Sequence, residues 1–428
     1  MFPSIWKRAN ITLIPKVQKP ESIDNFRPIS LTPTVSKIFE SLVGQHLMIE
    51  FEEKFDPGQY GARRGRSTTM ALIDIVHRFH SALDNGYSVR TLFVDYAKAF
   101  DHVSHALILE KMLNIGVDPW ILQWLNSFLF NRMQRVRINN FYSSFVSFNG
   151  GLPQGSWFGP FMFLVIINDL STTLPTYKFV DDVTVVETLT SSNGDLMQQA
   201  CSDLEQWSKE NFMTINVKKT CEMVIKGQRR NENEPDPLRI DGRDLLRVST
   251  FKLLGVFIQC NLKWNCHVEY ICSKANSRLH FLRSLCRCNI ASRDLVKFYC
   301  SVIRSVLEYA CEVFHSSITT EQSTMIETIQ KRALRIIYGY SYSYVDLLTL
   351  SGLQRLSERR ESLCSKLFNS IVMQNTHCLH HLLPPKREVC AIGVSTRAAF
   401  SNPFVLPRFK TERCRNEFIN YSLYNFTI

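Results

Sequence analysis

The chain has 428 residues, of which 45% are hydrophobic, and a formal net charge of +11. This length and apolar content favour a folded protein of two or three domains and exclude a disordered chain. The longest uninterrupted apolar run, Phe161 to Ile167, is far too short to cross a bilayer, and no signal-peptide pattern opens the chain. The thirteen cysteines include no CxxC pair, so we expect reduced thiols in an intracellular protein and no disulfide framework or zinc ribbon.

The positive charge is concentrated in the C-terminal part of the chain. Residues 1–260 carry 28 Lys and Arg against 27 Asp and Glu, whereas residues 261–428 carry 22 against 12. A basic region beside a near-neutral body predicts that a polyanion such as nucleic acid is held at one side. The alternative is a basic face that contacts only solvent.

The first expected elements are two strands joined by a loop. A strand-like run from Trp6 ends at Lys16, and Arg27 lies at the start of the next apolar stretch. Lys16 and Arg27 would then flank the tip of a hairpin, where two cations are suited to gripping phosphate. Ordinary surface charge on a turn is the alternative.

Two helices separated by a Gly- and Arg-rich loop are predicted next. The loop, over residues 59–69, could follow a nucleic-acid backbone with its arginines, and it ends in a Ser or Thr suited to capping the second helix. The second helix has apolar residues at helical spacing from Ala71 to Phe79. The arginines of the loop are Arg63, Arg64 and Arg66. The first helix, over residues 36–51, has an apolar side made of Ile38, Leu42, Val43, Leu47 and Ile49.

A buried strand is predicted to place Asp95 at its end, before a turn and a further helix. An aspartate there is commonly a cap or turn residue. Further along, Gly151-Leu152-Pro153-Gln154-Gly155 predicts a turn that opens an apolar helix. Glycines allow close approach of the backbone to a ligand, although such a turn can also be a simple connector.

Asp181 and Asp182 interrupt a run of β-branched and aromatic residues from Tyr177 to Val186. Such a pair between two strands predicts the tight turn of a hairpin. Successive side chains on extended backbone point to opposite sides, so we do not expect the two carboxylates to do the same job. A merely polar turn is the alternative.

The order of these features has a chemical logic. Phosphoryl transfer with two metal ions needs carboxylates from separate strands converging on ions roughly 3.5–4 Å apart. A strand-end aspartate and an Asp-Asp hairpin can supply them, with a glycine-rich turn between. Because the donors are hard oxygens, Mg²⁺ is the expected metal and zinc is not.

After residue 260 the chain is predicted to be helical. Residues 268–285, 295–306 and 325–336 each place apolar side chains on one face, which requires the three helices to pack together. A further helix is expected over residues 347–373, followed by a partly irregular tail from Pro384. The cations left for solvent or phosphate include Lys274, Arg278, Lys331, Arg332 and Arg335.

The segments described above resemble reverse transcriptases of the non-LTR (LINE-type) retrotransposon family. The resemblance implies an α+β, right-hand polymerase with fingers and palm built on an antiparallel sheet over residues 1–260. It also implies a helical thumb over residues 261–340 and a C-terminal extension, helical and then irregular, over residues 341–428. The matching segments, in the family's order, are residues 25–31, 59–69, 93–101, 151–156, 167–170, 179–182, 216–220 and 251–256.

The resemblance assigns catalytic roles by position. Asp95, Asp181 and Asp182 match the catalytic aspartates, with Asp95 and Asp181 the expected direct ligands of two Mg²⁺ ions, for which Mn²⁺ could substitute. Lys219 matches a lysine proposed to donate a proton to the leaving pyrophosphate, although the adjacent Lys218 leaves the register open.

The resemblance also assigns nucleotide contacts. Phe100 matches the position at which an aromatic ring would clash with a ribose 2′-OH, although a core Phe is the alternative. Gln154 matches the residue that lies against the incoming nucleotide, and Lys16 and Arg27 match cations near its triphosphate. Two departures from the family pattern are Val180, where Ala is usual, and the bulky Trp157.

The activity implied is RNA-directed DNA polymerisation. The expected partners are an RNA template, a DNA primer and dNTPs, with an endonuclease of the full-length element as a further partner. The chain begins within the fingers, with no endonuclease domain before it and no Cys/His knuckle after it, and so resembles a fragment of such an element. The alternatives are a catalytically inactive nucleic-acid-binding relic and a relative of group II intron or telomerase enzymes.

Overall fold

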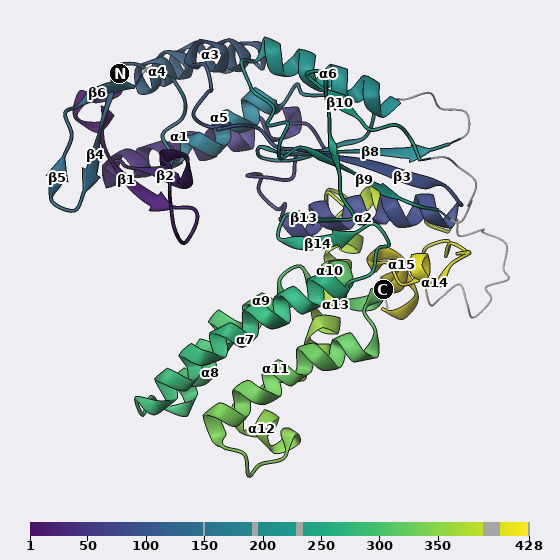
Figure 1. The fold of residues 1–428 in the computed structure, drawn as a ribbon. Helices are drawn as coiled ribbons and strands as arrows, with labels where there is room; N and C mark the ends of the chain where they lie inside the picture. Colours follow the sequence, from purple (N-terminus) through teal and green to yellow (C-terminus); the bar gives the residue numbers. More distant parts are fainter. Residues whose placement is uncertain (149, 191–195, 228–233, 388–402, 427–428) are drawn as a thin grey trace.

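The computed structural model describes residues 1–148, 150–190, 196–227, 234–387 and 403–426. In Figure 1 a first sheet lies at the left, a second sheet lies at the upper right, and a long helical projection extends below them. We call these parts the finger sheet, the palm sheet and the thumb.

The palm sheet has the strand order β12-β9-β3-β8-β7 and is antiparallel except for the edge pair β12–β9. Every residue of its central strand β3 is buried. Leu92 and Val94 enter one apolar cluster, with helices α5 and α6, while Val89 and Phe93 enter a second one, with α2. This alternation explains why neither side of β3 is exposed to solvent. The elements are α2 (Thr68–Asp84), β3 (Ser88–Val94), α5 (Phe158–Ile167), β7 (Thr176–Phe179), β8 (Asp182–Leu189), α6 (Leu196–Glu210), β9 (Cys221–Ile225) and β12 (Leu246–Arg247).

The finger sheet has the order β2-β1-β4-β5, with β6 paired to β4. β1 is antiparallel to β2 and parallel to β4. Residues 8–12, near the start of the chain, therefore lie beside residues 133–137, which follow Asp95 in the sequence. The elements are β1 (Arg8–Pro15), β2 (Phe26–Leu31), α1 (Thr34–Glu50), α3 (His105–Asn114), α4 (Pro119–Leu129), β4 (Arg132–Ile138), β5 (Phe141–Tyr142) and β6 (Val146–Phe148).

Helix α1 is rotated relative to the prediction. Ile38, Leu42 and Ile49 are 57%, 62% and 70% exposed, so their assignment to the buried side was wrong. The buried side instead contains Ser36, Glu40, Gly44 and Leu47. Its polar groups are satisfied, because the Glu40 carboxylate accepts hydrogen bonds of 2.6 Å from the hydroxyls of Ser36 and Ser156.

Gly44 makes room for the bulky Trp157. A Cβ at position 44 would lie 1.8 Å from the Trp157 ring, so α1 can pack against this side chain only where it has a glycine.

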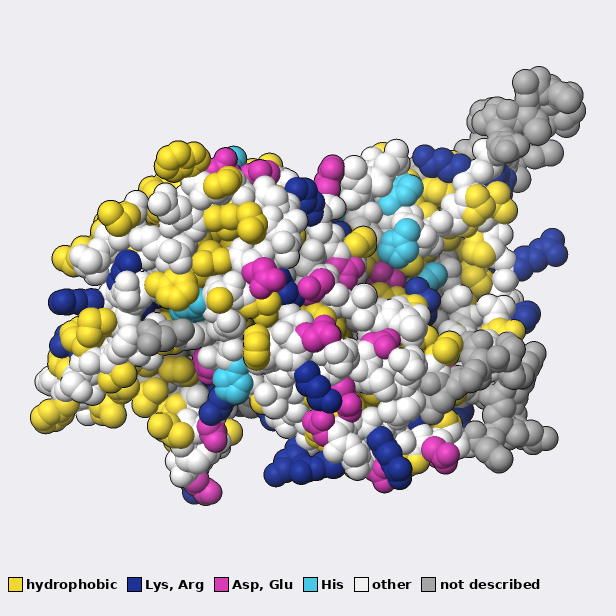
Figure 2. All heavy atoms as spheres, turned by 90° about the horizontal axis from the view of Figure 1, so that it is seen from above, with side chains coloured by type: hydrophobic (Ala, Val, Ile, Leu, Met, Phe, Trp, Pro, Cys, Tyr) yellow, Lys and Arg dark blue, Asp and Glu magenta, His cyan; other side chains and the backbone are white. Residues whose placement is uncertain are grey.

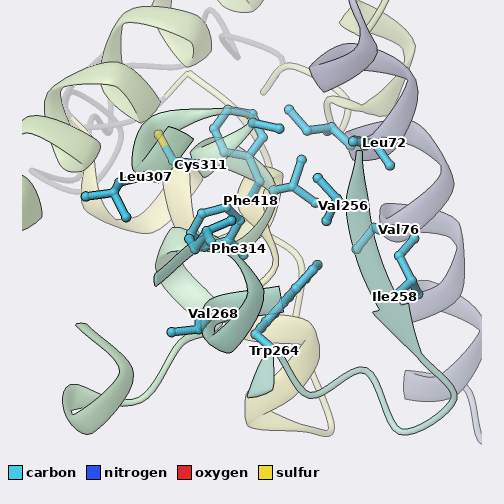
Figure 3. Close-up of a cluster of buried hydrophobic side chains, with 14 of the residues drawn as sticks. Leu72, Val76, Val256, Ile258, Trp264, Val268, Leu307, Cys311, Phe314 and Phe418 are labelled. Atoms are coloured by element: carbon cyan, nitrogen blue, oxygen red, sulfur yellow. The ribbon is translucent and has the colours of Figure 1, made fainter. Parts of the chain in front are cut away.

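The thumb follows a small hairpin, β13 (Thr250–Leu253) with β14 (Val256–Gln259). Figure 3 shows side chains from α2, β14, the thumb and the last helix of the chain in one buried cluster. Its members include Leu72 of α2, Val256 of β14, and Phe314 and Phe418 from the helical region. The thumb helices are α7 (Asn265–Arg287), α8 (Ser292–Phe298), a π-helical turn (Tyr299–Arg304), α9 (Ser305–Glu308), α10 (Cys311–Phe314) and α11 (Thr320–Tyr338).

The chain then returns to the palm. Glu417 lies 2.9 Å from His77 of α2, and the Asp84 carboxylate accepts hydrogen bonds of 2.8 Å from the amide and the hydroxyl of Thr411. The division of the helical region at residue 340 stays a prediction, because the later helices bury side chains in the same cluster as α7 and α11. These helices are α12 (Tyr344–Ser351), α13 (Leu356–Met373), α14 (Glu412–Arg415) and α15 (Phe418–Asn425).

Within the part of the chain that the structure describes, no helix combines the length and the apolar character needed to cross a membrane. The cysteines of that part are free thiols.

Candidate active site

The structure brings the three predicted aspartates to one end of the palm sheet. Asp95 directly follows β3. Asp181 lies in the turn between β7 and β8, and Asp182 is the first residue of β8. Val94 of β3 pairs with Val183 of β8, so the next position along β3 is beside the Asp pair. The site therefore depends on the register of these two central strands.

Electrostatics at this end of the sheet are unfavourable without a counterion. Burial and the Asp95 carboxylate raise the pKa of Asp181 above its ordinary value, against the opposing effect of Arg27. Partial desolvation, with the Asp181 and Asp95 charges, raises the pKa of Asp182 to about 6. Neighbouring carboxylates that repel one another in this way are suited to a cation.

Three residues of the segment after α6 hold Asp95. The Asn216 side chain donates a hydrogen bond of 3.1 Å to its carboxylate, and Thr220 accepts one of 3.2 Å from its amide. The Lys219 ammonium lies 3.6 Å from the same carboxylate, on a side chain that is 70% exposed. Of the adjacent Lys218 and Lys219, it is Lys219 whose ammonium lies beside Asp95.

The Asp turn contains a strained residue. Val180 has a φ of +59°, a left-handed conformation that is costly for a β-branched side chain. The Gln59 side-chain oxygen holds this conformation, since it accepts hydrogen bonds from the amides of Val180 at 3.0 Å and Gly61 at 2.8 Å. Gly61 lies against the turn, and a Cβ there would be 2.4 Å from the Val180 nitrogen.

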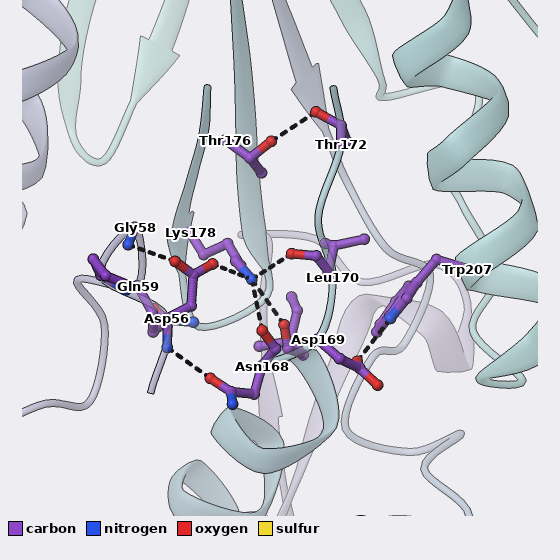
Figure 4. A network of polar contacts seen from close by, with 12 residues as sticks. Asp56, Gly58, Gln59, Asn168, Asp169, Leu170, Thr172, Thr176, Lys178 and Trp207 are labelled. Carbon is purple, nitrogen blue, oxygen red and sulfur yellow. Dashed lines mark hydrogen bonds and ion pairs between the residues drawn. The ribbon is translucent and has the colours of Figure 1, made fainter. Parts of the chain in front are cut away.

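Strand β7 is held in place by its own buried lysine, Lys178. The Lys178 ammonium, with no exposed side-chain surface, lies 2.5 Å from Asp56 and donates to the carbonyl oxygens of Leu170 at 2.6 Å and Ile167 at 3.0 Å. Figure 4 shows these contacts converging between β7 and the end of α5. The Asn168 side-chain oxygen accepts a hydrogen bond of 2.8 Å from the Asp56 amide. The segment 167–170 therefore positions the strand that leads to the aspartates.

The glycine-rich turn connects the finger sheet to the palm. The Gln154 carbonyl accepts a hydrogen bond of 2.7 Å from the Ser30 amide, and its side-chain amide donates one of 3.1 Å to Asp101. Glu40 fixes the end of this turn through Ser156 and the Trp157 amide at 3.1 Å. Sequence reasoning missed Glu40, although its four-residue spacing from Ser36 and Gly44 was a signal of a second, polar stripe on α1.

Phe100 is half-buried and stacks on Phe163 of α5, with ring centroids 4.8 Å apart. The Phe100 backbone is next to the glycine-rich turn, because its carbonyl accepts a hydrogen bond of 2.7 Å from the Leu152 amide.

The two finger cations lie on the β1–β2 hairpin. Arg27 is exposed, and its positive charge lowers the pKa of Asp181. The Lys16 ammonium donates a hydrogen bond of 3.0 Å to the Asp24 carbonyl. Sequence reasoning missed Lys98, which forms an exposed ion pair of 2.8 Å with the Asp24 carboxylate and so links the palm to this hairpin.

The arginines of the 59–69 loop differ in exposure. Arg63 is buried, and its guanidinium binds Glu52 at 2.7 Å and the Asp56 carbonyl at 2.7 Å. This corrects the expectation that Arg63 follows a nucleic-acid backbone, because its donors are used inside the protein. Arg66 is half-buried and donates to the Gln59 carbonyl at 3.1 Å, while Arg64 is exposed.

The thumb cations are also used in part by the protein. Arg278 donates to the Val302 carbonyl, and Arg332 donates to Asn276 of α7 at 2.9 Å. The other cations lie near aromatic rings, with Lys331 6.0 Å from Tyr344, Arg335 5.8 Å from Tyr340 and Lys274 5.6 Å from Tyr270. Of the five predicted, Lys274 and Arg332 are exposed.

No three His, Cys, Asp or Glu side chains converge into a preassembled metal-binding group among the described residues. The three aspartates do offer hard oxygen donors, and their negative charge is only partly offset by Lys219 and Arg27, which suits Mg²⁺. The donor chemistry therefore fits the expected metal.

Comparison with known families identifies the protein class. The sequence profile of the family described as "Reverse transcriptase (RNA-dependent DNA polymerase)" matches residues 14–258, which include the palm sheet, the finger sheet apart from most of β1, and all three aspartates. The chain belongs to this reverse transcriptase family. This confirms the resemblance to the non-LTR type and the α+β polymerase fold predicted from the sequence. A second profile, "Alkylated DNA repair protein alkB homolog 8, N-terminal", matches residues 264–305.

Similar proteins come from insect mobile elements. The chain is 27% identical over 368 residues to a probable RNA-directed DNA polymerase from transposon BS of Drosophila melanogaster, covering 82% of this chain and 40% of that protein. It is 26% identical to the RNA-directed DNA polymerase from mobile element jockey of the same fly, covering 79% and 38%. The chain thus spans about two fifths of the length of these relatives.

A similar solved structure is that of apo telomerase from Candida tropicalis. The identity is 14%, the TM-score is 0.48, and the likeness covers 81% of this chain and 60% of the telomerase chain.

Proposed function

We propose that this chain is an RNA-directed DNA polymerase that adds dNTPs to a primer 3′-OH on an RNA template. The observation that carries the proposal is the meeting of Asp95 with Asp181 and Asp182 at one end of the palm sheet, in a chain of the reverse transcriptase family. Three mutually repelling carboxylates have little use in a structural protein, and they match the needs of phosphoryl transfer.

Asp95 and Asp181, with Asp182 beside them, would hold two Mg²⁺ ions. When bound, the metal supplies an activated primer hydroxyl and neutralises charge on the leaving pyrophosphate. Arg27, exposed near Asp181, is suited to binding the triphosphate, and Lys16 lies on the same hairpin. Lys219 is suited to giving a proton to the pyrophosphate, since its ammonium is exposed and lies 3.6 Å from Asp95.

Two further residues would set the position and the kind of nucleotide. Gln154 would border the nucleotide site from the glycine-rich turn, and the Phe100 backbone is hydrogen-bonded to the same turn. Together they would orient the sugar and exclude a 2′-OH.

The test is primer extension on poly(rA)/oligo(dT) by the purified chain with dTTP and Mg²⁺, with Mn²⁺ in a parallel reaction. We expect extension in a time-dependent ladder of products. Duplex binding without any extension would contradict the proposal and favour an inactive nucleic-acid-binding relic.

Phe100→Ala is expected to raise incorporation of rNTPs relative to dNTPs by about tenfold or more, because the proposed exclusion of ribose is steric. The measurement is the ratio of kcat/KM for UTP and dTTP in variant and parent. Phe163→Leu, which alters only the ring beneath, is the control. An unchanged ratio in Phe100→Ala would make Phe100 a packing residue.

Gly61→Ala is expected to lower the extension rate by about 100-fold, since the new Cβ must displace the turn that carries Asp181. Single-turnover extension at saturating dNTP measures the effect. Gly159→Ala is the matched control, because a Cβ there makes only an ordinary contact of 3.6 Å with the Pro153 carbonyl. Equal rates in the two variants would show that the Asp turn tolerates the displacement.

A further inference from the structure

A buried histidine, His105, contacts the glycine-rich turn. It is the first residue of α3 and is 2% exposed. Its Nε2 atom lies 2.7 Å from the Gly151 carbonyl oxygen. Since a carbonyl oxygen can only accept, Nε2 carries the proton and donates this hydrogen bond. The contact joins two residues that are 46 positions apart in the sequence.

This hydrogen bond clamps one peptide group of the turn. The peptide that joins Gly151 to Leu152 has its carbonyl bonded to His105, and its N–H donates a hydrogen bond of 2.7 Å to the Phe100 carbonyl. Both polar groups of this peptide are therefore bonded to the same stretch of chain, between the end of β3 and α3. The peptide plane cannot rotate without breaking one of the two hydrogen bonds.

The clamped peptide lies at a point where the backbone has the most conformational freedom. Gly151 has a φ of +75°, and a Cβ there would lie 2.6 Å from the Asp101 carbonyl oxygen, so only glycine fits. Three residues further on, the Gln154 side chain donates a hydrogen bond of 3.1 Å to the Asp101 carboxylate. The orientation of the clamped peptide therefore sets the direction in which the chain runs to Gln154.

The second ring nitrogen indicates that stability alone does not explain a histidine at this position. Nδ1 of His105 is buried, and no protein group in the described part of the chain bonds to it. Such a nitrogen costs free energy, which an apolar side chain of similar size would avoid. The ring packs edge-on against Phe130, with centroids 5.5 Å apart, and lies 6.1 Å from Phe148. An apolar side chain could also make these contacts, so the Nε2 donor is what histidine adds.

The surroundings keep the ring neutral. Burial lowers the pKa of His105; the hydrogen bond to Gly151 opposes this effect, and the charge of Arg132 adds to it. At the far left of Figure 2, where the fingers lie, surface side chains are mainly hydrophobic or basic, and acidic ones gather nearer the centre. At neutral pH the ring therefore carries one proton, on Nε2.

We propose that His105 is a positioning residue that fixes the glycine-rich turn and thereby holds Gln154 against the incoming nucleotide. The proposal rests on the proposed function, in which Gln154 borders the nucleotide site. His105 does not touch the nucleotide and acts only through the turn. The competing explanation is that His105 merely fills space in the core.

The experiment measures binding of dTTP to the full chain in complex with an oligo(rA)/oligo(dT) duplex in Mg²⁺. The primer ends in a 2′,3′-dideoxynucleotide, so no extension takes place, and titration calorimetry gives the Kd. We expect His105→Asn to raise this Kd about tenfold, because its amide nitrogen reaches only as far as Nδ1 and loses the hydrogen bond to Gly151. His105→Gln should stay within about twofold of the parent, because its amide nitrogen reaches as far as Nε2. His105→Leu, which removes the donor without burying an amide, should behave like His105→Asn and replaces it if that variant does not fold.

Two further comparisons separate positioning from packing. Gln154→Ala alone should weaken dTTP binding, and adding His105→Asn to it should raise the Kd by less than about twofold, since an effect transmitted through Gln154 is not additive with its loss. His80 of α2 is the matched control, because it is also 2% exposed and its Nδ1 likewise lacks a partner among the described residues. His80→Asn should bind dTTP like the parent. Thermal unfolding reports the stability of each variant.

Parental dTTP affinity in both His105→Asn and His105→Leu would overturn the proposal. Equal losses in His105→Asn and His105→Gln would also overturn it, because the donor at the Nε2 position would then have no role. Full additivity with Gln154→Ala, or parental affinity in Gln154→Ala alone, would do the same.

Primer extension by the parent chain keeps this proposal apart from the proposed function. Extension without any effect of His105 on dTTP binding rejects the positioning role alone. The expected effects on dTTP binding without extension reject only the polymerase activity. A parent chain that neither binds dTTP nor extends the primer would overturn both.

Discussion

Asp181→Asn is expected to reduce primer extension by at least about a thousandfold while the protein remains folded. The amide keeps the size of the carboxylate but loses the negative charge that would hold Mg²⁺, a contribution of several kcal/mol to phosphoryl transfer. Asp95→Asn should have the same effect. The measurement is single-turnover extension with saturating duplex and dNTP.

Stability separates this effect from misfolding. Burial and the nearby Asp95 raise the pKa of Asp181, so the charged carboxylate destabilises the folded state in the absence of a cation. Asp181→Asn should therefore unfold at the same temperature as the parent or at a higher one. Asp244→Asn, which removes an exposed carboxylate paired with Arg239, is the control and should extend primers normally. Extension at the parental rate in Asp181→Asn would refute the metal assignment.

Lys178→Met is expected to lower the free energy of unfolding by about 3 kcal/mol. Methionine fills a similar volume, but it removes the ammonium that pairs with the Asp56 carboxylate and donates to three backbone carbonyl oxygens. This loss of stability is at the low end of what breaking a buried ion pair costs, because the Asp56 side chain is 26% exposed and can still bind water. Urea unfolding followed by circular dichroism measures the change.

Lys226→Met is the matched control, since Lys226 is 67% exposed and pairs with a half-exposed Glu234. It should change stability little, because exposed ion pairs are screened by water. If both lysine variants unfold alike, the network around Lys178 has no special role in holding β7.

The aspartates could be located from the sequence because their signals are local. A Val-rich strand that ends at Asp95 and a hairpin turn at Asp181 are both marked by immediate neighbours, and the strands then pair as expected. The order of these segments along the chain was enough to identify the family.

The rotation of α1 could not be predicted, because it depends on a distant partner. Glu40 is buried by contacts with Ser156, 116 residues further along, and a helical pattern does not reveal which of two stripes faces such a partner. The expectation that Arg63 follows a nucleic-acid backbone was wrong for a related reason. An Arg-Arg-Gly-Arg run is typical of a surface loop, and the sequence does not show that Glu52 and the Asp56 carbonyl accept the hydrogen bonds of Arg63.

The return of the chain to α2 has a mechanical consequence. The chain links the palm to the thumb where β14 leads into α7. The C-terminal region then contacts the palm again, because Thr411 binds Asp84 of α2 and Glu417 binds His77 of α2. The base of the thumb also shares a buried apolar cluster with α2 and β14, so it is held against the palm over a continuous surface. Any bending of the thumb would therefore displace its far end most, near α12, which lies far from the palm in Figure 1.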